Sequence, residues 1–502
     1  MPTSSDASGP PFQAIEWLDW SAAAFARAAL ERKPVLLSIT ASWCHGCAVM
    51  DRTTYADPAI VTAIREQTIP VRVDADRRPD VNERYNLEGW PSTALLTPSG
   101  EILTGSTYVT PDIMPRMLAD TVAACASQYD ELMRRAVDVA AARRAARTTH
   151  RYEPDPGAPE WFAEHLLSAH DPVHGGFGGD GKFLNSAALR FALDRAAGGD
   201  GRFVPVVTRT LDGMLSGAIV DDVDGGFFRY ASGRDWSRPH TEKMLEDQAA
   251  MAWLLADAAA LFDRADYQAR ALDAVGYVQR TLADTARGGF YASQRADQDY
   301  YAMSGSIRRT LEPPVVDRTL FTDANAQAAV AWLQIGAVTG RVELGRLALQ
   351  SLERVLLASY RPGEGVAHWT GPGAVRGLLA DHVHAAWALL HLHEATGNET
   401  YPMLAEELLR TALRTTWDET DGGFLDHVAG PDDIGLLADP VKPLALNCLA
   451  ARVLSRLSRL SGRSDLQRFA AAALASQTGV YRSQGLAAAP YAIAVAEVMA
   501  AE

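Results

Sequence analysis

The stretch Trp43-Cys44-His45-Gly46-Cys47 decides the fold of the first part of this chain. The apolar run Val35–Ile39 precedes it, and the segment Ala48–Arg52 can continue behind it as a helix. A strand, a turn carrying Cys-x-x-Cys and then a helix is the arrangement of a redox-active dithiol, because unpaired N–H groups at a helix N-terminus favour thiolate over thiol. We therefore expect Cys44 to be an exposed nucleophile of lowered pKa and Cys47 to resolve a mixed disulfide.

A zinc half-site is the alternative interpretation of these two cysteines. Zinc takes about four ligands, and the other two cysteines of the chain, Cys125 and Cys448, have no paired spacing. The residues therefore favour redox chemistry over metal binding, and we expect neither a metal nor a cofactor. Cys125 and Cys448 each lie in an apolar helical context and are expected to be buried core thiols.

Length and charge limit the function classes. A chain of 502 residues predicts two or more domains. The formal net charge of -15 argues against nucleic acid as a partner. No apolar run approaches the ~20 residues of a membrane-spanning helix, and residues 1–12, expected to be a disordered lead, lack the basic and apolar regions of a secretion signal. We expect a cytoplasmic protein without a membrane partner, in which the dithiol rests reduced.

The elements expected around the dithiol form a thioredoxin-like α/β domain over residues 13–127. Pro91 precedes the third strand, where that fold has a cis proline lying against the dithiol, and would leave a backbone edge free to pair with a substrate. With Trp90, it is our candidate for substrate binding. The expected elements are helices at 17–32, 48–52, 58–66 and 111–127 and strands at 35–39, 69–74, 94–96 and 102–103.

A recurring glycine loop organises the second half of the chain. After a polar connector at 128–157, long helical segments alternate with loops that begin at Gly175, Gly225, Gly288, Gly365, Gly422 and Gly479, four of them reading Gly-Gly-Phe. Six recurrences of one loop between helices predict six helical hairpins, here closed as an α/α barrel over 158–500. Because acidic residues often precede the Gly-Gly-Phe, we expect the loops and inner-helix ends to converge on one funnel.

These stretches together resemble a known family, the thioredoxin-domain proteins with an appended six-hairpin barrel, which includes the spermatogenesis-associated thioredoxin-like protein. The matching runs include Val73–Asp80, Gly89-Trp90-Pro91, Leu379-Ala380-Asp381 and, most specifically, Pro239–Leu245. The resemblance implies a thioredoxin fold in front and, behind it, a barrel similar to sugar 2-epimerases and six-hairpin glycosidases. Gly46 departs from the pattern, since the family usually has an aromatic residue there.

An acid–base cluster follows the second Gly-Gly-Phe. His240, Glu242, Glu246 and Asp247 fall within eight residues, and the spacing of Glu242 and Glu246 places both on one face of a helix. A base beside a carboxylate at a funnel mouth suits proton abstraction or glycosidic acid catalysis. The alternative is that these residues make structural ion pairs with Lys243 and Arg229, and the sequence favours neither interpretation. The residues that we expect to converge on the funnel are Arg229, His240, Glu242, Asp247 and Asp381.

A second cluster is formed by Asp381, His382 and His384. Two histidines on one helix are more often structural residues than a site. An epimerase with paired histidines would take one from each of two hairpins, and His240 with His382 or His427 is the combination that the sequence offers.

The leading function is thiol–disulfide exchange through Cys44 and Cys47, with a protein or a small molecule as the thiol or disulfide substrate. In that case the barrel binds a carbohydrate-like ligand or a partner. The alternative is a sugar epimerase or glycoside-processing barrel whose thioredoxin-like domain is regulatory or structural. A noncatalytic scaffold is the third possibility.

Overall fold

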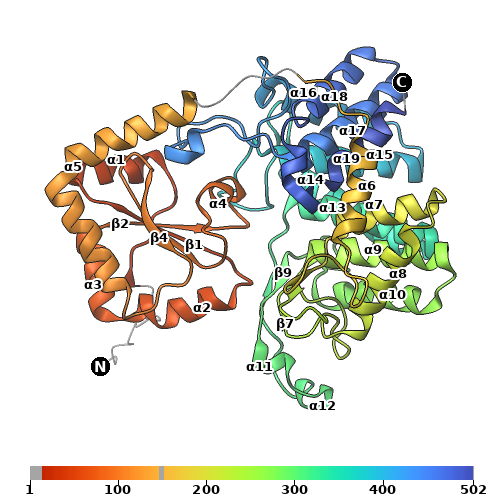
Figure 1. Cartoon of the computed structure of the whole chain (residues 1–502), viewed down its shortest axis with the longest axis horizontal. Coiled ribbons are helices and arrows are strands. Elements are labelled where there is room, and N and C mark those ends of the chain that lie inside the picture. The colour runs from red at the N-terminus through yellow and green to blue at the C-terminus, as the bar shows by residue number, and fades with distance from the viewer. Residues whose placement is uncertain (1–13, 146–151, 501–502) are drawn as a thin grey trace, which may run out of the picture. The chain divides into compact units, whose positions relative to one another are not determined.

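The structure, a computed structural model, describes residues 14–145 and 152–500, so the expected lead at 1–12 lies outside the described residues. The chain forms two compact units (Figure 1). The first comprises residues 1–148 together with 429–440, and the second comprises 149–428 and 441–502. The sequence analysis assigned the whole of 158–500 to one domain and did not predict that 429–440 belong to the first unit.

The first unit has a four-stranded sheet in the order β2-β1-β3-β4. Strand β1 pairs in parallel with β2 and antiparallel with β3, and β3 pairs antiparallel with β4. This is the mixed sheet of a thioredoxin-like domain, as the sequence predicts. The strands are β1 Val35–Thr40, β2 Ile69–Asp74, β3 Ser92–Leu96 and β4 Ile102–Ser106, and the helices are α1 Ala22–Glu31, α2 His45–Arg52, η2 Thr54–Ala56, α3 Pro58–Gln67, α4 Pro79–Tyr85 and α5 Met114–Ala145.

Capping residues explain where several of these helices begin. The helix expected from residue 17 starts instead at Ala22, because Ser21 is in extended conformation and its side chain accepts from the backbone N–H of Ala24. The carboxylate of Asp57 caps α3 in the same way. The helix expected at 111–127 and the start of the connector expected at 128–157 form one helix, α5. Within α5 only Gln128 departs from helical backbone angles.

Residues 429–440 are held to the rest of the first unit by specific hydrogen bonds. The Tyr85 hydroxyl donates to the carbonyl of Gly100 at 2.7 Å and accepts from the N–H of Leu436 at 2.8 Å. The Trp20 indole N–H donates to the carbonyl of Asp432 at 3.0 Å. This segment includes the short helix η3, Gly435–Ala438. The first unit is thus completed by a segment that lies about 280 residues beyond α5 in the chain.

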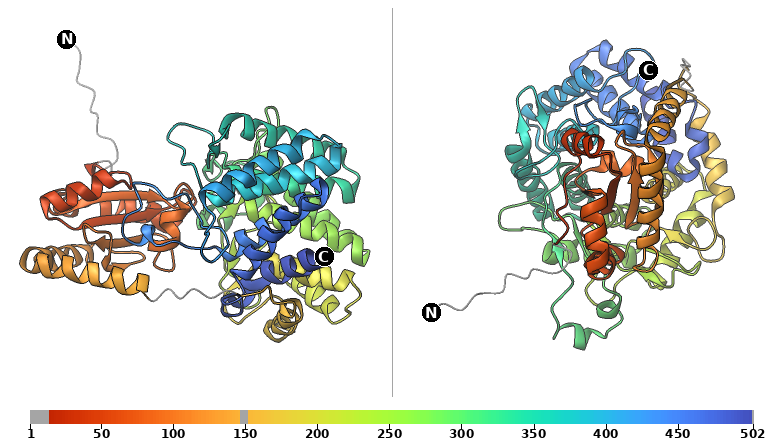
Figure 2. Two further views of the ribbon diagram at one scale, coloured as in Figure 1. Left: turned by 90° about the horizontal axis from the view of Figure 1, so that it is seen from above. Right: turned by 90° about the vertical axis from the view of Figure 1, so that its left-hand side faces the viewer.

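The second unit is a closed ring of helical hairpins (Figure 2). Among the described residues, six inner helices pack side by side, with α19 closing against α7, and six outer helices cover them. The final inner helix α19 packs against the first outer helix α6, so the two ends of the unit form the sixth hairpin. The inner helices are α7 Ser186–Ala197, α9 Leu245–Phe262, α13 Thr322–Thr339, α15 Leu379–Thr396, α17 Leu444–Ser461 and α19 Ala489–Met499; the outer ones are α6 Ala158–Ala169, α8 Phe203–Ser216, α10 Ala265–Thr281, α14 Val342–Ser359, α16 Thr400–Thr415 and α18 Ser464–Ala475.

The two ends of the ring differ in their connections. Turns from an inner helix to the next outer one are short, such as 263–264 between α9 and α10. The connections back to an inner helix are long and carry short strands and helices. These are β5 Lys182–Phe183, β6 Tyr230–Ala231, β7 Pro239–His240, β8 Lys243–Met244, β9 Ser293–Gln294, α11 Gln298–Tyr301, α12 Gly305–Arg308, β10 Val316–Asp317, β11 Tyr360–Arg361, β12 Gly365–Val366 and η4 Tyr481–Ala488. The N-terminal ends of the inner helices therefore lie under elaborated loops.

Each complete Gly-Gly-Phe turn is built around an aspartate four residues before its first glycine. The carboxylate pairs with a cation, so a charge that the fold buries is compensated. The sequence analysis noted that acids precede this motif but did not predict that these four aspartates are used inside the turns. The pairs are Asp171 with Lys182 at 3.0 Å, Asp221 with Lys243 at 2.7 Å, Asp284 with Arg354 at 3.0 Å and Asp418 with Lys442 at 2.8 Å.

An amide side chain on the inner helix holds the phenylalanine of the turn. Asn325, the fourth residue of α13, accepts from the N–H of Phe290 at 2.7 Å and donates to its carbonyl at 3.0 Å. The fourth residues of α9 and α17, Gln248 and Asn447, do the same for their own turns. The repeat found in the sequence is therefore a repeat of hydrogen bonding as well as of chain path.

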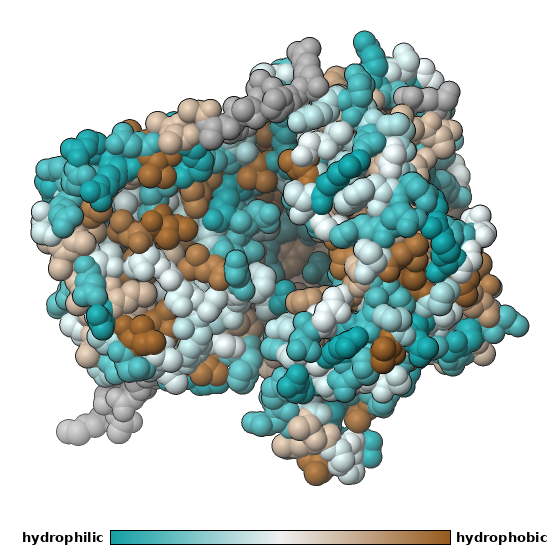
Figure 3. Space-filling view, in the orientation of Figure 1, coloured by the Kyte–Doolittle hydropathy of each residue, from teal (hydrophilic) through white to brown (hydrophobic). Residues whose placement is uncertain are grey.

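Figure 3 shows a largely hydrophilic face on which hydrophobic residues are scattered, as is usual for a folded chain. In the described part of the chain, every helix is too short or too polar to cross a bilayer.

Candidate functional sites

The dithiol lies at the start of α2. Cys44 is the N-cap of this helix, and its Sγ atom accepts a 3.0 Å hydrogen bond from the N–H of Cys47. The two cysteines form a disulfide, with their Cα atoms 5.3 Å apart. The position at a helix N-terminus agrees with the sequence prediction, and the structure shows the oxidised form of the pair.

Cys44 is buried rather than exposed, with 4% of its surface accessible. The segment Trp90-Pro91 lies against the dithiol turn. A Cβ atom placed on Gly46 would lie 3.2 Å from Pro91 Cδ, 3.5 Å from the Trp90 carbonyl oxygen and 4.0 Å from Cys44 Sγ. Pro91 follows a cis peptide bond and contacts the dithiol turn, as the sequence analysis predicts.

Two tryptophans flank the dithiol. The rings of Trp43 and Trp90 meet edge to face with their centroids 5.1 Å apart. The Trp43 indole N–H donates to the carboxylate of Asp76 at 2.9 Å, and that of Trp90 donates to Asn82 Oδ1 at 3.1 Å. Since both indoles are fixed in this way, the surroundings of the dithiol are preorganised. Next to them His45 is exposed.

The second candidate site is the barrel mouth at the N-terminal ends of the inner helices. Glu246 and Asp247 are the second and third residues of α9, Asp323 is the second of α13 and Asp381 is the third of α15. Helix N-termini carry a partial positive charge that stabilises carboxylates in the first turn. The ring closure thus gathers acids that are up to 135 residues apart in the sequence.

These carboxylates influence one another. Burial and the charge of Glu246 raise the pKa of Asp247. Burial and the charge of Asp323 raise the pKa of Glu246, and Arg229 opposes both shifts. Burial raises the pKa of Asp323. The charge of His368 opposes this shift, and the charge of Asp381 adds to it. Glu246 is accessible to water within the mouth although the ring surrounds it. Groups with raised pKa values in such a mouth can carry protons near neutral pH.

His368 is the residue of this site that the sequence analysis missed. Its Nδ1 atom lies 2.9 Å from a carboxylate oxygen of the fully buried Asp381 and 4.0 Å from Asp323. An aspartate that orients a histidine is the arrangement of a general base. The signal available in the sequence was the position of His368-Trp369 directly after the degenerate glycine loop at Gly365.

The same residues could hold a divalent cation. One ligand atom from each of Asp323, His368 and Asp381 lies within 4.8 Å of the other two. Carboxylate and imidazole donors suit several divalent metals. For an ion to bind, the hydrogen bond between His368 and Asp381 would have to be replaced.

His240 and Glu242 lie before α9 and not on it. The helix begins at Leu245, so Glu242 and Glu246 do not share a helical face, which corrects the sequence prediction. The His240 ring stacks on Tyr230 at 3.9 Å, and its Nε2 atom lies 3.0 Å from the Ser232 hydroxyl. Burial lowers the pKa of His240, Glu242 opposes that shift and Arg229 adds to it.

Glu242 does not form the structural pair with Lys243 that we considered, because Lys243 binds Asp221. Only 8% of Glu242 is accessible, and among the described residues its Oε2 atom has no hydrogen-bond partner. Arg229 lies within electrostatic range of His240, Glu246 and Asp247. Arg229 therefore lies between two groups of residues at the mouth, namely His240 and Glu242 before α9 and Glu246 and Asp247 on it.

The histidines of α15 have different surroundings. His382 is the fourth residue of the helix, the position that Gln248, Asn325 and Asn447 occupy in other repeats, and its Nδ1 atom lies 2.9 Å from the carbonyl of Leu378. This is a structural position. Burial lowers the pKa of His384, and the charge of Asp323 opposes this shift. His384 therefore lies within electrostatic range of Asp323 at the barrel mouth.

The fold and its two sites define a class of protein, in which a thioredoxin-like dithiol domain is followed by a six-hairpin α/α barrel. Residues 11–146 match the family model Thioredox_DsbH, described as a protein of unknown function, DUF255. Human spermatogenesis-associated protein 20 is 31% identical over 310 residues, which are 57% of this chain and 39% of that protein. The resemblance that the sequence analysis stated is thereby confirmed. The chain spans about two fifths of the length of such curated relatives.

Each half also has a separate likeness. The thiol:disulfide interchange protein DsbD 1 of Pseudomonas aeruginosa is 31% identical over 102 residues, which are 19% of this chain and 17% of that protein. A sugar epimerase from a ruminal bacterium superposes with a TM-score of 0.51 at 14% identity, covering 64% of this chain and 87% of the other. This second likeness shows the fold alone.

Proposed function

We propose that the first unit is a thiol–disulfide oxidoreductase. In the reducing direction the Cys44 thiolate attacks a substrate disulfide and releases one substrate thiolate. Cys47 then attacks the mixed disulfide, so that the substrate leaves with two thiols and the Cys44–Cys47 disulfide forms. Two electrons pass from the dithiol to the substrate, and the reverse direction oxidises a substrate dithiol.

The observation that carries this proposal is the hydrogen bond from the Cys47 N–H to Cys44 Sγ at the N-cap of α2. A donor at a helix N-terminus stabilises the thiolate that both nucleophilic attack and departure require. The named activity of the Pseudomonas aeruginosa protein, thiol:disulfide interchange, supports the same chemistry for this chain.

The test is to trap the mixed disulfide. The Cys47→Ser variant, incubated with oxidised glutathione or a disulfide-containing peptide, should accumulate an adduct at Cys44 that mass spectrometry locates. Cys44→Ser should form no adduct at Cys47, and Cys125→Ser, which removes a buried thiol in α5, should behave like the unchanged chain. Absence of any adduct in Cys47→Ser, while DTT still reduces the disulfide of the unchanged chain, would reject the proposal.

A second function concerns the barrel, and a specific observation favours it. His368 oriented by Asp381 beside carboxylates of raised pKa is suited to removing and returning a proton at a sugar carbon or to protonating a glycosidic oxygen. We propose the barrel as a sugar epimerase or glycoside-processing enzyme. Incubation with reducing sugars in D₂O, followed by NMR, should show deuterium at the carbon beside the carbonyl if it epimerises, and cleaved glycosides if it hydrolyses.

Variants separate this site from the rest of the barrel. His368→Asn and Asp381→Asn should abolish either product, whereas His393→Asn, a change in the last turn of the same helix α15, should not. Turnover that persists in the first two variants would place the chemistry elsewhere.

A further inference from the structure

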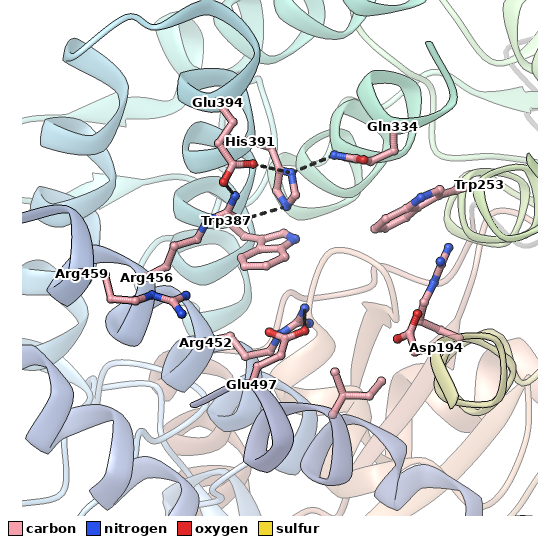
Figure 4. Close-up of a pocket in the computed structure, with 12 residues that line it drawn as sticks. Asp194, Trp253, Gln334, Trp387, His391, Glu394, Arg452, Arg456, Arg459 and Glu497 are labelled. Atoms are coloured by element: carbon pink, nitrogen blue, oxygen red, sulfur yellow. Dashed lines mark hydrogen bonds and ion pairs between the residues drawn. The ribbon is translucent and has the colours of Figure 1, made fainter. Parts of the chain in front are cut away.

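A cavity of about 580 Å³ lies among the inner helices of the ring (Figure 4). Its walls come from the middle and later parts of the inner helices. Trp253 is the ninth residue of α9, Gln334 the thirteenth of α13, and Glu394 and Arg459 the sixteenth of α15 and α17. At 1.5 Å per residue these positions lie roughly 12–22 Å along their helices from the first residue. The cavity is thus toward the end with short turns and is a separate site from the carboxylates at the mouth.

Arginines dominate one wall. Arg452, Arg456 and Arg459 follow one another at spacings of four and three, so they share one face of α17. With Arg190 of α7 they place four guanidinium groups around the cavity, against three carboxylates in the described lining. Arg190 is paired with Asp257 outside the lining at 2.5 Å, so the positive charge that faces the cavity comes from the arginines of α17.

The ion pairs of the lining leave one cation uncompensated. Arg452 binds Glu497 at 2.6 and 2.7 Å, and Arg456 pairs with Glu394. Within the part of the chain that the structure describes, Arg459 has no ion pair, and it is exposed. Burial and the neighbouring charge of Arg459 lower the pKa of Arg456, as expected where two guanidinium groups lie close together. An anion placed beside Arg456 and Arg459 would relieve this repulsion.

The rest of the lining suits a ring with hydroxyl groups. The indoles of Trp253 and Trp387 come from two different helices and flank the cavity in Figure 4. Arg190 lies 4.4 Å over the Trp253 ring and Arg452 lies 4.5 Å over the Trp387 ring, which fixes both indoles in place. Asp194 also borders the cavity and can accept hydrogen bonds. An apolar surface with a few convergent polar groups is typical of a small-molecule site.

We propose that this cavity binds a monosaccharide-sized ligand carrying one anionic group, a phosphate or a carboxylate. The anionic group lies beside Arg456 and Arg459, the ring lies against the tryptophans, and Asp194 accepts from a hydroxyl. The volume falls within the range of about 300–1,000 Å³ that ligand sites usually have. A phosphate carries −1.5 to −2 charges at pH 7 and takes several hydrogen bonds from guanidinium groups. This site is independent of the dithiol and of the chemistry proposed for the barrel mouth.

Isothermal titration of the full chain with four probes tests the proposal: glucose 6-phosphate, glucuronate, glucose and inorganic phosphate. At least one anionic sugar should bind saturably, with an affinity at least tenfold above that of glucose and of inorganic phosphate, and binding should weaken as salt is added. The phosphate and carboxylate probes show which anionic group the site selects.

Arg459→Gln should weaken binding of that sugar at least tenfold, and it should not disturb the fold because Arg459 is exposed at the edge of the cavity. Trp387→Leu should also weaken it. Arg468→Gln, the same change of charge on the exposed face of the outer helix α18, should leave binding unchanged. No saturable binding of either anionic sugar at millimolar concentration, equal binding by Arg459→Gln and the unchanged chain, or equal affinity for inorganic phosphate alone would overturn the proposal.

Discussion

The backbone N–H of Cys47 donates a 3.0 Å hydrogen bond to the Sγ atom of Cys44 across the first turn of α2. This hydrogen bond links the two cysteines in addition to their disulfide, and it does not need the disulfide in order to form. A negative sulfur at this position gains both the hydrogen bond and the partial charge of the helix end.

The first prediction is that Cys44 in the reduced chain has a pKa below the value of about 8.5 of a free cysteine. Iodoacetamide alkylation against pH, followed by peptide mass spectrometry, should show a midpoint for Cys44 clearly below that value. Cys125 serves as the internal control, since burial raises the pKa of its thiol. Alkylation of Cys47 before Cys44, or a midpoint at 8.5 or above, would contradict the assigned roles.

A second prediction concerns the buried ion pair of the second Gly-Gly-Phe turn. Asp221 and Lys243 are fully buried, and Asp221 also pairs with Arg308 at 2.8 Å. Asp221→Asn therefore removes the carboxylate that both cations share and should destabilise the second unit by about 3–5 kcal/mol. Asp222→Asn removes the neighbouring carboxylate, which is exposed and paired with Arg270, and should cost no more than about 1 kcal/mol. Urea unfolding of the two variants measures the difference. Equal midpoints would show that the Asp221 carboxylate does not hold the turn.

The third prediction concerns pH. Burial, together with Arg456 and Arg452, lowers the pKa of His391 to about 3. An unfolded chain protonates this histidine near pH 6.5. As the pH falls from about 6.5 to about 3, the unfolded state therefore binds a proton that the folded state does not, and stability is lost over that range. Its contribution to the slope is at most about 1.4 kcal/mol per pH unit.

The His391→Gln variant should lose this component, so its unfolding free energy should depend less steeply on pH between about 6.5 and 3 than that of the unchanged chain. The difference between the two profiles isolates His391 from the other titrating groups. Parallel profiles would mean that His391 takes up its proton at the same pH in the folded and the unfolded states.

A fourth prediction distinguishes a site from a structural pair at Glu242. Because Lys243 is already bound to Asp221, and Glu242 Oε2 has no hydrogen bond within the described residues, Glu242→Gln should change the unfolding free energy by no more than about 1 kcal/mol. If the barrel mouth binds a ligand, the same variant should lose that binding in the sugar screen. A loss of several kcal/mol with unchanged ligand binding would instead favour a structural role.

Much of the fold could be predicted from local patterns. The apolar run before Cys44, the proline before the third strand and the helix after the dithiol each report on a few neighbouring residues, and the order of such elements limits the topology. The Gly-Gly-Phe loops were equally informative. Each needs residues with positive φ, which glycine adopts readily, as at Gly225 and Gly226. The loops also recur once in each hairpin.

The sites were less predictable, because long-range closure assembles them. His368 contacts Asp381 only when the loop after Gly365 folds back over α15. Asp221 is close in sequence to the mouth residues of α9, yet it pairs with Lys243 inside its own Gly-Gly-Phe turn. Burial decides these roles, since a buried carboxylate must find a cation wherever the fold supplies one. The spacing of Asp381 and the other acids alone could not separate those that face the mouth from those that brace a turn.

The sequence by itself thus determined the dithiol, the thioredoxin-like order of elements and the six hairpins, since each depends on contacts within a helix, a strand or a turn. Only the tertiary structure decided that residues 429–440 complete the first unit and that Arg459 shares a cavity with Trp253. These features join parts of the chain that are hundreds of residues apart. The neighbours of Arg459 are set by which helices the closed ring brings together, and residues 429–440 are held by hydrogen bonds to Trp20 and Tyr85 of the first unit. Local sequence preferences contain no information about either.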